Sequence, residues 1–184
     1  MKRCAVVYSI VMSGLIYGAN LSGAAAQSNA APIKSAQSSG VTVAIARVAV
    51  SQRKVTLQFI ATNETKARVY LRDAWGEQSQ RAFLGSGEQL SFPSVIGIER
   101  CDAPVTQCSG PDGNDLNRYS YIEPGEFTAF GFTYESSSPV NENDTISLTA
   151  VLVARFTTPN GDPSQVGPLK AIRFNFPFVP LNHG

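Results

Sequence analysis

The stretch VTVAIARVAV at residues 41–50 decides the fold, because its apolar side chains return at every second position. Val41, Val43 and Ile45 would share one face of an extended chain, and a period of two is typical of a half-buried β-strand. After Arg47 the apolar phase moves by one residue, so the inward face changes. A β-bulge or bend produces such a change. The pattern therefore predicts a first strand that bends, as a strand crossing between two sheets would.

The same alternation returns along the chain between clusters of turn residues, and no window shows the spacing of a long amphipathic helix. Several short strands separated by turns are typical of an antiparallel sandwich. We therefore predict an all-β fold, an antiparallel immunoglobulin-like β-sandwich formed by one domain over residues 41–184. A small β-barrel is the alternative. The clearest further strands are expected at Val55–Phe59, Val69–Leu71, Phe130–Tyr134, Ile146–Val153 and Ile172–Phe178.

Residues 1–26 have the composition of a secretory signal peptide. Lys2 and Arg3 precede an uncharged, largely apolar run that closes on small residues at 24–26. We predict cleavage after Ala26 and a periplasmic or extracellular location. An uncleaved membrane anchor is the alternative, because the uncharged run is long enough to span a bilayer. Residues 27–40 are small and polar without periodicity, so we expect a flexible tether there.

The predicted cleavage changes the charge of the chain. The full sequence carries 15 Lys and Arg against 14 Asp and Glu, a formal charge of +1. Cleavage would remove Lys2 and Arg3 and no acidic residue, so the charge would become −1. A near-neutral chain has no electrostatic footprint for nucleic acid or anionic lipid. We therefore expect no nucleic-acid partner, and no membrane span once the signal peptide is removed.

Two cysteines would remain after cleavage, Cys101 and Cys108, because Cys4 lies within the signal peptide. In an oxidising compartment, a pair with C-x6-C spacing is most simply a structural disulfide. A redox-active pair usually has the tighter C-x-x-C spacing, and a zinc site would need further ligands. We therefore predict that a Cys101–Cys108 disulfide closes a short loop.

Groups suited to acid–base catalysis are scarce. The single histidine, His183, lies next to the C-terminal residue, which argues against a catalytic triad and against histidine-ligated metals. We expect no cofactor, no metal and no enzymatic activity. A carboxylate-dependent hydrolase is the weaker alternative, with Glu123, Glu126 and Asp115 as candidate acids. The Asp- and Asn-rich segment at 111–117 departs from the spacing of a calcium loop, and we interpret it as a solvated turn.

The only tryptophan, Trp75, is the candidate for a ligand platform. It lies in an expected turn at residues 73–76, after a strand in which Tyr70 and Arg72 are expected on a water-facing side. Exposed aromatic rings can stack on sugars, so Trp75 and Tyr70 could form a carbohydrate- or small-ligand-binding site. The other interpretation is a tryptophan that closes one end of the core.

The order of turns in the chain resembles a known family. An asparagine turn at Asn63, an Asp-x-x-Gly turn at Asp73–Gly76, and Pro124-Gly125-Glu126 ahead of an aromatic strand follow one another. This order resembles the exported bacterial immunoglobulin-like modules of DUF4352 type, over the region from Val41 to Leu152. The resemblance implies a sandwich fold and an exported, non-enzymatic role, with no catalytic residues to carry over. The C-x6-C insertion and the phenylalanine-rich final strand depart from the family pattern.

Together these features lead us to expect an exported binding or envelope-assembly module. Recognition often resides on loops that a rigid scaffold positions. The two long polar loops expected at Asp73–Gln89 and Cys101–Arg118 would then contact a macromolecular partner, either a protein or another envelope component. A carbohydrate- or small-ligand-binding protein is the alternative.

Overall fold

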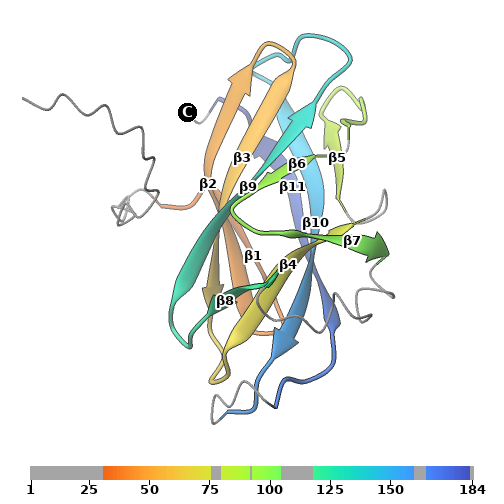
Figure 1. Ribbon diagram of the computed structural model, residues 1–184. Helices are drawn as coiled ribbons and strands as arrows, with labels where there is room; N and C mark the ends of the chain where they lie inside the picture. Colours follow the sequence, from red (N-terminus) through yellow and green to blue (C-terminus); the bar gives the residue numbers. More distant parts are fainter. Residues whose placement is uncertain (1–30, 76–79, 92, 105–117, 160–164, 183–184) are drawn as a thin grey trace, which may run out of the picture. The chain divides into compact units, whose positions relative to one another are not determined.

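The computed structural model describes residues 31–75, 80–91, 93–104, 118–159 and 165–182, without the side chains of Trp75 and residues 101–104. The part from residue 31 onwards forms one compact unit, and its described residues form β-strands and no α-helix (Figure 1). The strands are β1 (Lys34–Ser38), β2 (Val41–Ser51), β3 (Lys54–Asn63), β4 (Val69–Trp75), β5 (Arg81–Leu84), β6 (Ser94–Ile96), β7 (Arg100–Pro104), β8 (Ser120–Ile122), β9 (Phe127–Glu135), β10 (Thr145–Phe156) and β11 (Lys170–Pro180).

The strands form two sheets that face each other without closing into a barrel. The first sheet has the order β1-β2-β3-β9-β6, and the second has the order β11-β10-β4-β7, with β5 also paired to β10 and β8 to β4. All pairs are antiparallel except β4 with β7. Within this arrangement, β2-β3-β9-β6 and β11-β10-β4 have the order of the two sheets of an immunoglobulin domain. The predicted immunoglobulin-like sandwich is therefore confirmed, and the barrel alternative is wrong.

The core lies between the sheets and is rich in phenylalanine. The ring of Phe59 on β3 stacks on Phe130 of β9 at 5.0 Å between centroids, and it meets Phe176 of the opposite sheet at 5.8 Å. These three side chains are buried, as the alternation predicts. Phe178, expected on the same face as Phe176, is instead 72% exposed. A shift in the β10–β11 register next to Phe178 turns it out of the core.

Strand β2 contains the predicted bulge but does not cross between sheets. The register with β3 shifts between Ile45 and Arg47, and the next apolar residue, Val48, is again fully buried. Throughout its length β2 keeps neighbours of one sheet, β1 and β3. The bulge therefore corrects the inward phase within the sheet, and the predicted crossing is wrong.

The sandwich begins earlier than the sequence indicates. Residues 34–38, expected to be part of a flexible tether over 27–40, form β1, which pairs antiparallel with the first half of β2. Ile33 donates its backbone N–H to Ile45, and both Ile33 and Ala36 pack against the core. A strand held mainly by backbone hydrogen bonds needs no apolar alternation, so its composition gave no signal. Residues 1–30, including the predicted signal peptide, lie outside the described part.

Nowhere in the described ranges is there a helix of the length and apolar character that crossing a membrane would require.

Candidate functional site: a tyrosine–arginine surface

Both faces of β4 are covered, although the sequence predicts one wet face. Val69 and Leu71 enter the core between the sheets, as expected. On the opposite face Tyr70 is only 5% exposed and Arg72 is fully buried, so the predicted water-facing side is wrong. The physical reason is a second apolar cluster outside the sandwich core. Its members are Tyr70, Ala74, Tyr119, Val151 and Val153.

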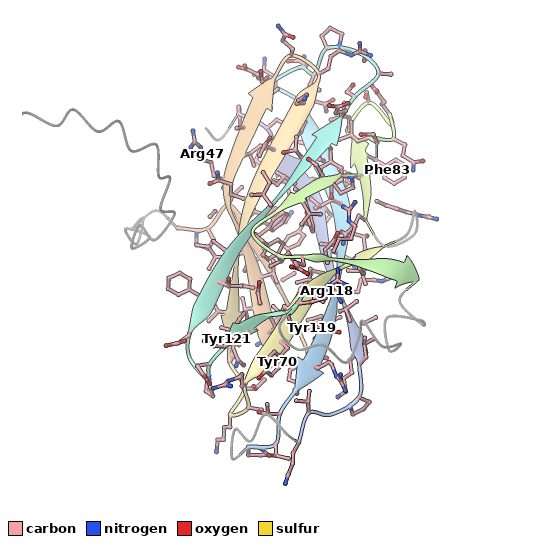
Figure 2. The ribbon with its side chains drawn as sticks, in the orientation of Figure 1. Arg47, Tyr70, Phe83, Arg118, Tyr119 and Tyr121 are labelled. Carbon is pink, nitrogen blue, oxygen red and sulfur yellow. The ribbon has the colours of Figure 1, made fainter. Side chains whose placement is uncertain are left out.

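Three tyrosines lie together on this outer face (Figure 2). Tyr70 of β4 is directly opposite Tyr121 of β8 in the strand register, with 6.2 Å between ring centroids. Tyr119, just before β8, meets Tyr70 edge-on at 6.4 Å. Tyr70 and Tyr119 are buried, whereas Tyr121 is 59% exposed. One exposed ring therefore stands on a packed aromatic base.

Tyr121 of β8 and Tyr119 just before it each have an arginine guanidinium over the ring. The Arg68 guanidinium lies 5.1 Å from the centroid of Tyr121, and that of Arg72 lies 5.2 Å from the centroid of Tyr119. Arg72 also donates to the backbone carbonyl of Arg100 at 2.6 Å. Such cation–π contacts hold the guanidinium groups in place and stiffen the aromatic rings beneath them.

The two partly exposed arginines of this face, Arg68 and Arg118, form ion pairs with carboxylates. Arg68 is paired with Glu123, and this hydrogen bond raises the pKa of the Arg68 guanidinium, so Arg68 stays charged. Arg118 Nε lies 3.2 Å from Glu99 Oε2, with both side chains partly exposed. We call the whole patch the tyrosine–arginine surface; it comprises Arg68, Tyr70, Arg72, Glu99, Arg118, Tyr119, Tyr121 and Glu123.

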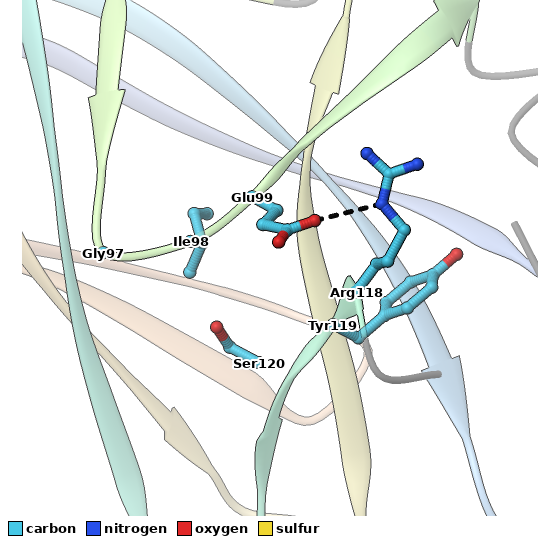
Figure 3. A pocket seen from close by; sticks show the side chains of 6 residues that line it. All are labelled: Gly97, Ile98, Glu99, Arg118, Tyr119 and Ser120. Atoms are coloured by element: carbon cyan, nitrogen blue, oxygen red, sulfur yellow. Dashed lines mark hydrogen bonds and ion pairs between the residues drawn. The ribbon is translucent and has the colours of Figure 1, made fainter. Parts of the chain in front are cut away.

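A cavity of about 340 Å³ opens at one side of this surface (Figure 3). The edge of β4 pairs with β8 at residues 69–71 and then with β7 from Asp73 onwards, so its partner changes between them. The cavity lies at this change of partner. Gly97 on its rim has φ +89°, and a Cβ there would lie 2.7 Å from the carbonyl oxygen of Ala129. The lining residues are Gly97, Ile98, Glu99, Arg118, Tyr119 and Ser120.

A buried polar cluster supports the surface from the core side of β4. Asp73 is fully buried, and its Oδ2 accepts from Arg100 Nε at 2.8 Å. Gln80 donates to the other carboxylate oxygen and to the carbonyl of Val151, the latter at 2.8 Å. Burial raises the pKa of Asp73 from its ordinary 3.8 to about 6, against the opposing effect of Arg100. The hydroxyl of Tyr134, whose pKa burial and Asp73 both raise, has no hydrogen-bond partner among the described residues.

The structure separates the two residues predicted for a ligand platform. The Tyr70 ring is buried under its neighbours, so it cannot offer a face to a sugar. Trp75 ends β4, where its backbone pairs with Pro104, so residues 73–75, expected in a turn, are part of a strand. The side chain of Trp75 lies outside the described part. The exposed ring on this surface is that of Tyr121, which the sequence does not single out as a site residue.

The other predicted site residues receive different outcomes. Glu123 is paired with Arg68, while Glu126 is exposed in the turn before β9. Asp115 and Cys108 lie outside the described residues, and Cys101 lies in β7. The Cys101–Cys108 disulfide and the turn expected at residues 111–117 therefore stay predictions. Within the described ranges, no three His, Cys, Asp or Glu side chains gather as a metal site would require.

Comparison with protein-family models, with curated proteins and with solved structures finds no match. The strand order defines the class of protein as an immunoglobulin-like β-sandwich. Fold alone does not define function, so the function is inferred from the chemistry of the surface.

Proposed function

We propose that this chain is a non-catalytic, exported binding module that recognises a protein partner through the tyrosine–arginine surface. The observation that carries the proposal is Tyr121, a ring 59% exposed that is held in place by Tyr70 and Arg68. The signal peptide and the resemblance to exported modules support a periplasmic or extracellular place, and both remain predictions.

Tyrosine and arginine are, with tryptophan, the residue types enriched among those that dominate protein–protein binding energy. Tyrosine has only two side-chain torsions, and the contacts of Tyr121 with Tyr70 and Arg68 restrict them before any partner arrives. Binding then costs little conformational entropy, which favours affinity. The surrounding buried rings provide a firm base of the kind found beneath such hot spots.

The charge pattern indicates the kind of partner. Arg68 and Arg118 each form an ion pair with a carboxylate, so the surface carries positive and negative charges without a large excess of either. A partner that is polar and aromatic rather than strongly charged fits such a surface. The cavity beside Tyr119 is large enough to accept a protruding side chain of that partner. Recognition is therefore assigned to a strand face and not to the loops expected from the sequence.

The test is capture from an envelope fraction by the immobilised native protein and its variants. Tyr121→Ala should reduce recovery of a specific partner at least tenfold, because truncating a central aromatic residue usually costs more than 1.4 kcal/mol. Tyr121→Phe should retain most of the recovery. Phe127→Ala is the matched control, since Phe127 is also an exposed aromatic, on β9 of the other sheet. A failure to find any partner whose recovery depends on Tyr121 would refute the proposal.

A further inference from the structure

A second hollow, of about 390 Å³, lies on the outer face of the same sheet, away from the tyrosine–arginine surface. β5 pairs with the first part of β10 at residues 146–149, whereas β4 pairs with its later part at residues 152–156. The two surfaces therefore lie at different ends of β10. We call the hollow the β5–β11 trough. Its lining residues are Arg81, Phe83, Ser147, Leu148, Thr149, Asn175, Phe176 and Pro177.

The trough has two walls and a floor. Arg81 and Phe83 on β5 form one wall, β10 forms the floor, and Asn175 and Pro177 on β11 form the other wall. Adjacent strands lie about 4.8 Å apart, so the β5 and β11 backbones are about 10 Å apart across β10. The volume between their side chains, about 390 Å³, is within the range of small-ligand sites. Phe83 is partly exposed and offers an apolar ring to it.

A strained bulge shapes the β11 wall. Two residues of β11, Pro177 and Phe178, lie opposite the single residue Ser147 of β10. Phe178 has φ +51°, a left-handed conformation that is rare outside glycine. Its N–H donates to Ser147 Oγ at 2.9 Å. Strained residues of this kind cluster at active sites and ligand-binding sites.

The polar groups of the trough retain unused hydrogen-bonding capacity. Ser147 Oγ accepts from the backbone, so its own proton is available to a ligand. Thr149 Oγ1 donates to Asn175 Oδ1 at 2.9 Å, which leaves the amide nitrogen of Asn175 as a donor and Thr149 as an acceptor. Vicinal hydroxyl groups of a sugar require such a mixture of donors and acceptors.

The charge at the trough is one-sided. Arg81 and Arg173 are exposed, and neither side chain has an ion pair or hydrogen bond with any described residue. None of the three strands β5, β10 and β11 contains an acidic residue. The acid that precedes β10, Asp144, accepts a hydrogen bond from the backbone of Thr145. The trough thus attracts an anion, and a guanidinium can bind a carboxylate through two parallel hydrogen bonds.

We infer that the β5–β11 trough binds a carboxylated polysaccharide, with Arg81 on the carboxylate, Phe83 against a ring face and the β10–β11 hydroxyl and amide groups on the sugar hydroxyls. An acidic peptide is disfavoured, because an extended peptide usually binds along a sheet edge, where it continues the hydrogen-bond ladder. The trough lies on a sheet face and offers no free backbone ladder.

The test is electrophoresis of the native protein in gels that contain alginate, polygalacturonate or hyaluronate. At least one polymer should retard the protein, and the carboxyl-reduced form of that polymer should not. Arg81→Gln should weaken this binding at least tenfold, and Thr149→Val should weaken it several-fold. Raising the salt from 50 to 300 mM should weaken it strongly, because the attraction is a screened surface interaction.

Two controls make the result decisive. Arg47→Gln removes another exposed arginine, from β2 of the other sheet, and should leave retardation unchanged (Figure 2). Tyr121→Ala should also leave it unchanged. The inference is overturned if no polymer retards the protein, if Arg47→Gln weakens binding as much as Arg81→Gln, or if polyglutamate binds as tightly as the polysaccharides. Thermal unfolding of Arg81→Gln should match that of the wild type, since the side chain is exposed.

Discussion

The outer face of the β11-β10-β4 sheet carries arginine and aromatic residues at two places, and the two places use them in opposite ways. On the tyrosine–arginine surface Arg68 and Arg118 are paired with Glu123 and Glu99. In the β5–β11 trough, Arg81 has no partner among the described residues. The same residue type therefore serves to fix a surface in one place and remains available for a ligand in the other.

Paired arginines make a surface rigid, whereas unpaired arginines attract anionic ligands. A guanidinium that is paired and stacked holds its neighbours in place but has little charge left to attract a distant anion. An unpaired guanidinium contributes little to stability and acts on an approaching ligand over about one Debye length. We therefore expect binding at the tyrosine–arginine surface to depend weakly on salt and binding at the trough to depend strongly on it.

The largest effect should come from Arg72, the fully buried arginine of the first surface. Arg72→Ala leaves a cavity above Tyr119 and removes a donor from the carbonyl of Arg100. We expect a loss of about 3 kcal/mol in the free energy of unfolding, measured with urea. Arg81→Ala should change it by less than about 0.5 kcal/mol. Equal effects of the two substitutions would remove the distinction between fixed and available arginines.

The second effect concerns the pH dependence of stability, through Asp73 beneath the same surface. Its pKa is raised from 3.8 to about 6, so the folded state binds its proton more tightly than the unfolded state. The resulting stabilisation is fully present below pH 3.8 and is lost as the pH rises through 6. The shift corresponds to about 3 kcal/mol between these limits.

Asp73→Asn should therefore flatten the fall in unfolding free energy between pH 4 and pH 7, relative to the wild type. Glu88 offers the matched control with the opposite sign. Hydrogen bonds from Ser137 and Ser136 lower its pKa to about 2, so its stabilisation is lost as the pH falls below 4.5. Glu88→Gln should alter the acidic limb only. An unchanged slope above pH 4 in Asp73→Asn would contradict the assignment.

The third effect lies between the two surfaces, at Gln80. Val151 of β10 lies between the residues that pair with β5 and those that pair with β4. The Gln80 side-chain amide donates to the carbonyl of Val151 and accepts from its N–H. Gln80→Ala would leave these buried groups unsatisfied, and we expect a loss of about 2 kcal/mol. Hydrogen exchange at the Val151 amide should quicken in parallel. A protected amide in the variant would show that the side chain does not complete the ladder.

The smallest effect should be a gain. Phe178 is largely exposed and left-handed, so glycine at this position relieves strain while little burial is lost. Phe178→Gly should raise the free energy of unfolding by about 0.5 kcal/mol, because the relief of the left-handed conformation exceeds the extra entropy that glycine gives the unfolded chain. The N–H that binds Ser147 is retained, so the trough should still bind its polysaccharide. Gln52→Gly is the control, because Gln52 in the β2–β3 turn has a similar left-handed backbone, with φ +49°, and should give a similar gain. A destabilised Phe178→Gly would show that the ring contributes packing that its exposure hides.

The strands that alternate apolar and polar residues could be predicted from the sequence. Val41, Val43 and Ile45 are all fully buried, and the phase change after Arg47 does mark a bulge. Periodicity works here because one face of each strand meets the opposite sheet. It failed for β1, whose small residues are held by backbone pairing, and for β7, whose pairing with β4 is parallel and short.

The candidate site was harder to predict, because Tyr70 and Arg72 look like residues of a wet face. Their burial depends on β8, a strand of three residues that returns from about 50 positions further along the chain. A signal was present in Tyr119 and Tyr121, which share the spacing of one strand face with each other. Which strand they would join could not be read from that spacing. The trough depends on the register of β11, where Phe178 continues the apolar alternation of Phe174 and Phe176 and so hides the extra residue, unlike the phase change in β2.

The early strand β1 has a practical consequence for the solubility of the protein. β1 covers the first half of the outer edge of β2, residues 41–45, and lies beside β11, where Lys34 donates to the carbonyl of Pro177. Without β1, the unpaired backbone groups would extend along the whole outer edge of β2 and form a template for edge-to-edge aggregation. A recombinant chain that starts at Val41, where the apolar pattern begins, should therefore aggregate, whereas one that starts before Ile33 should stay monodisperse.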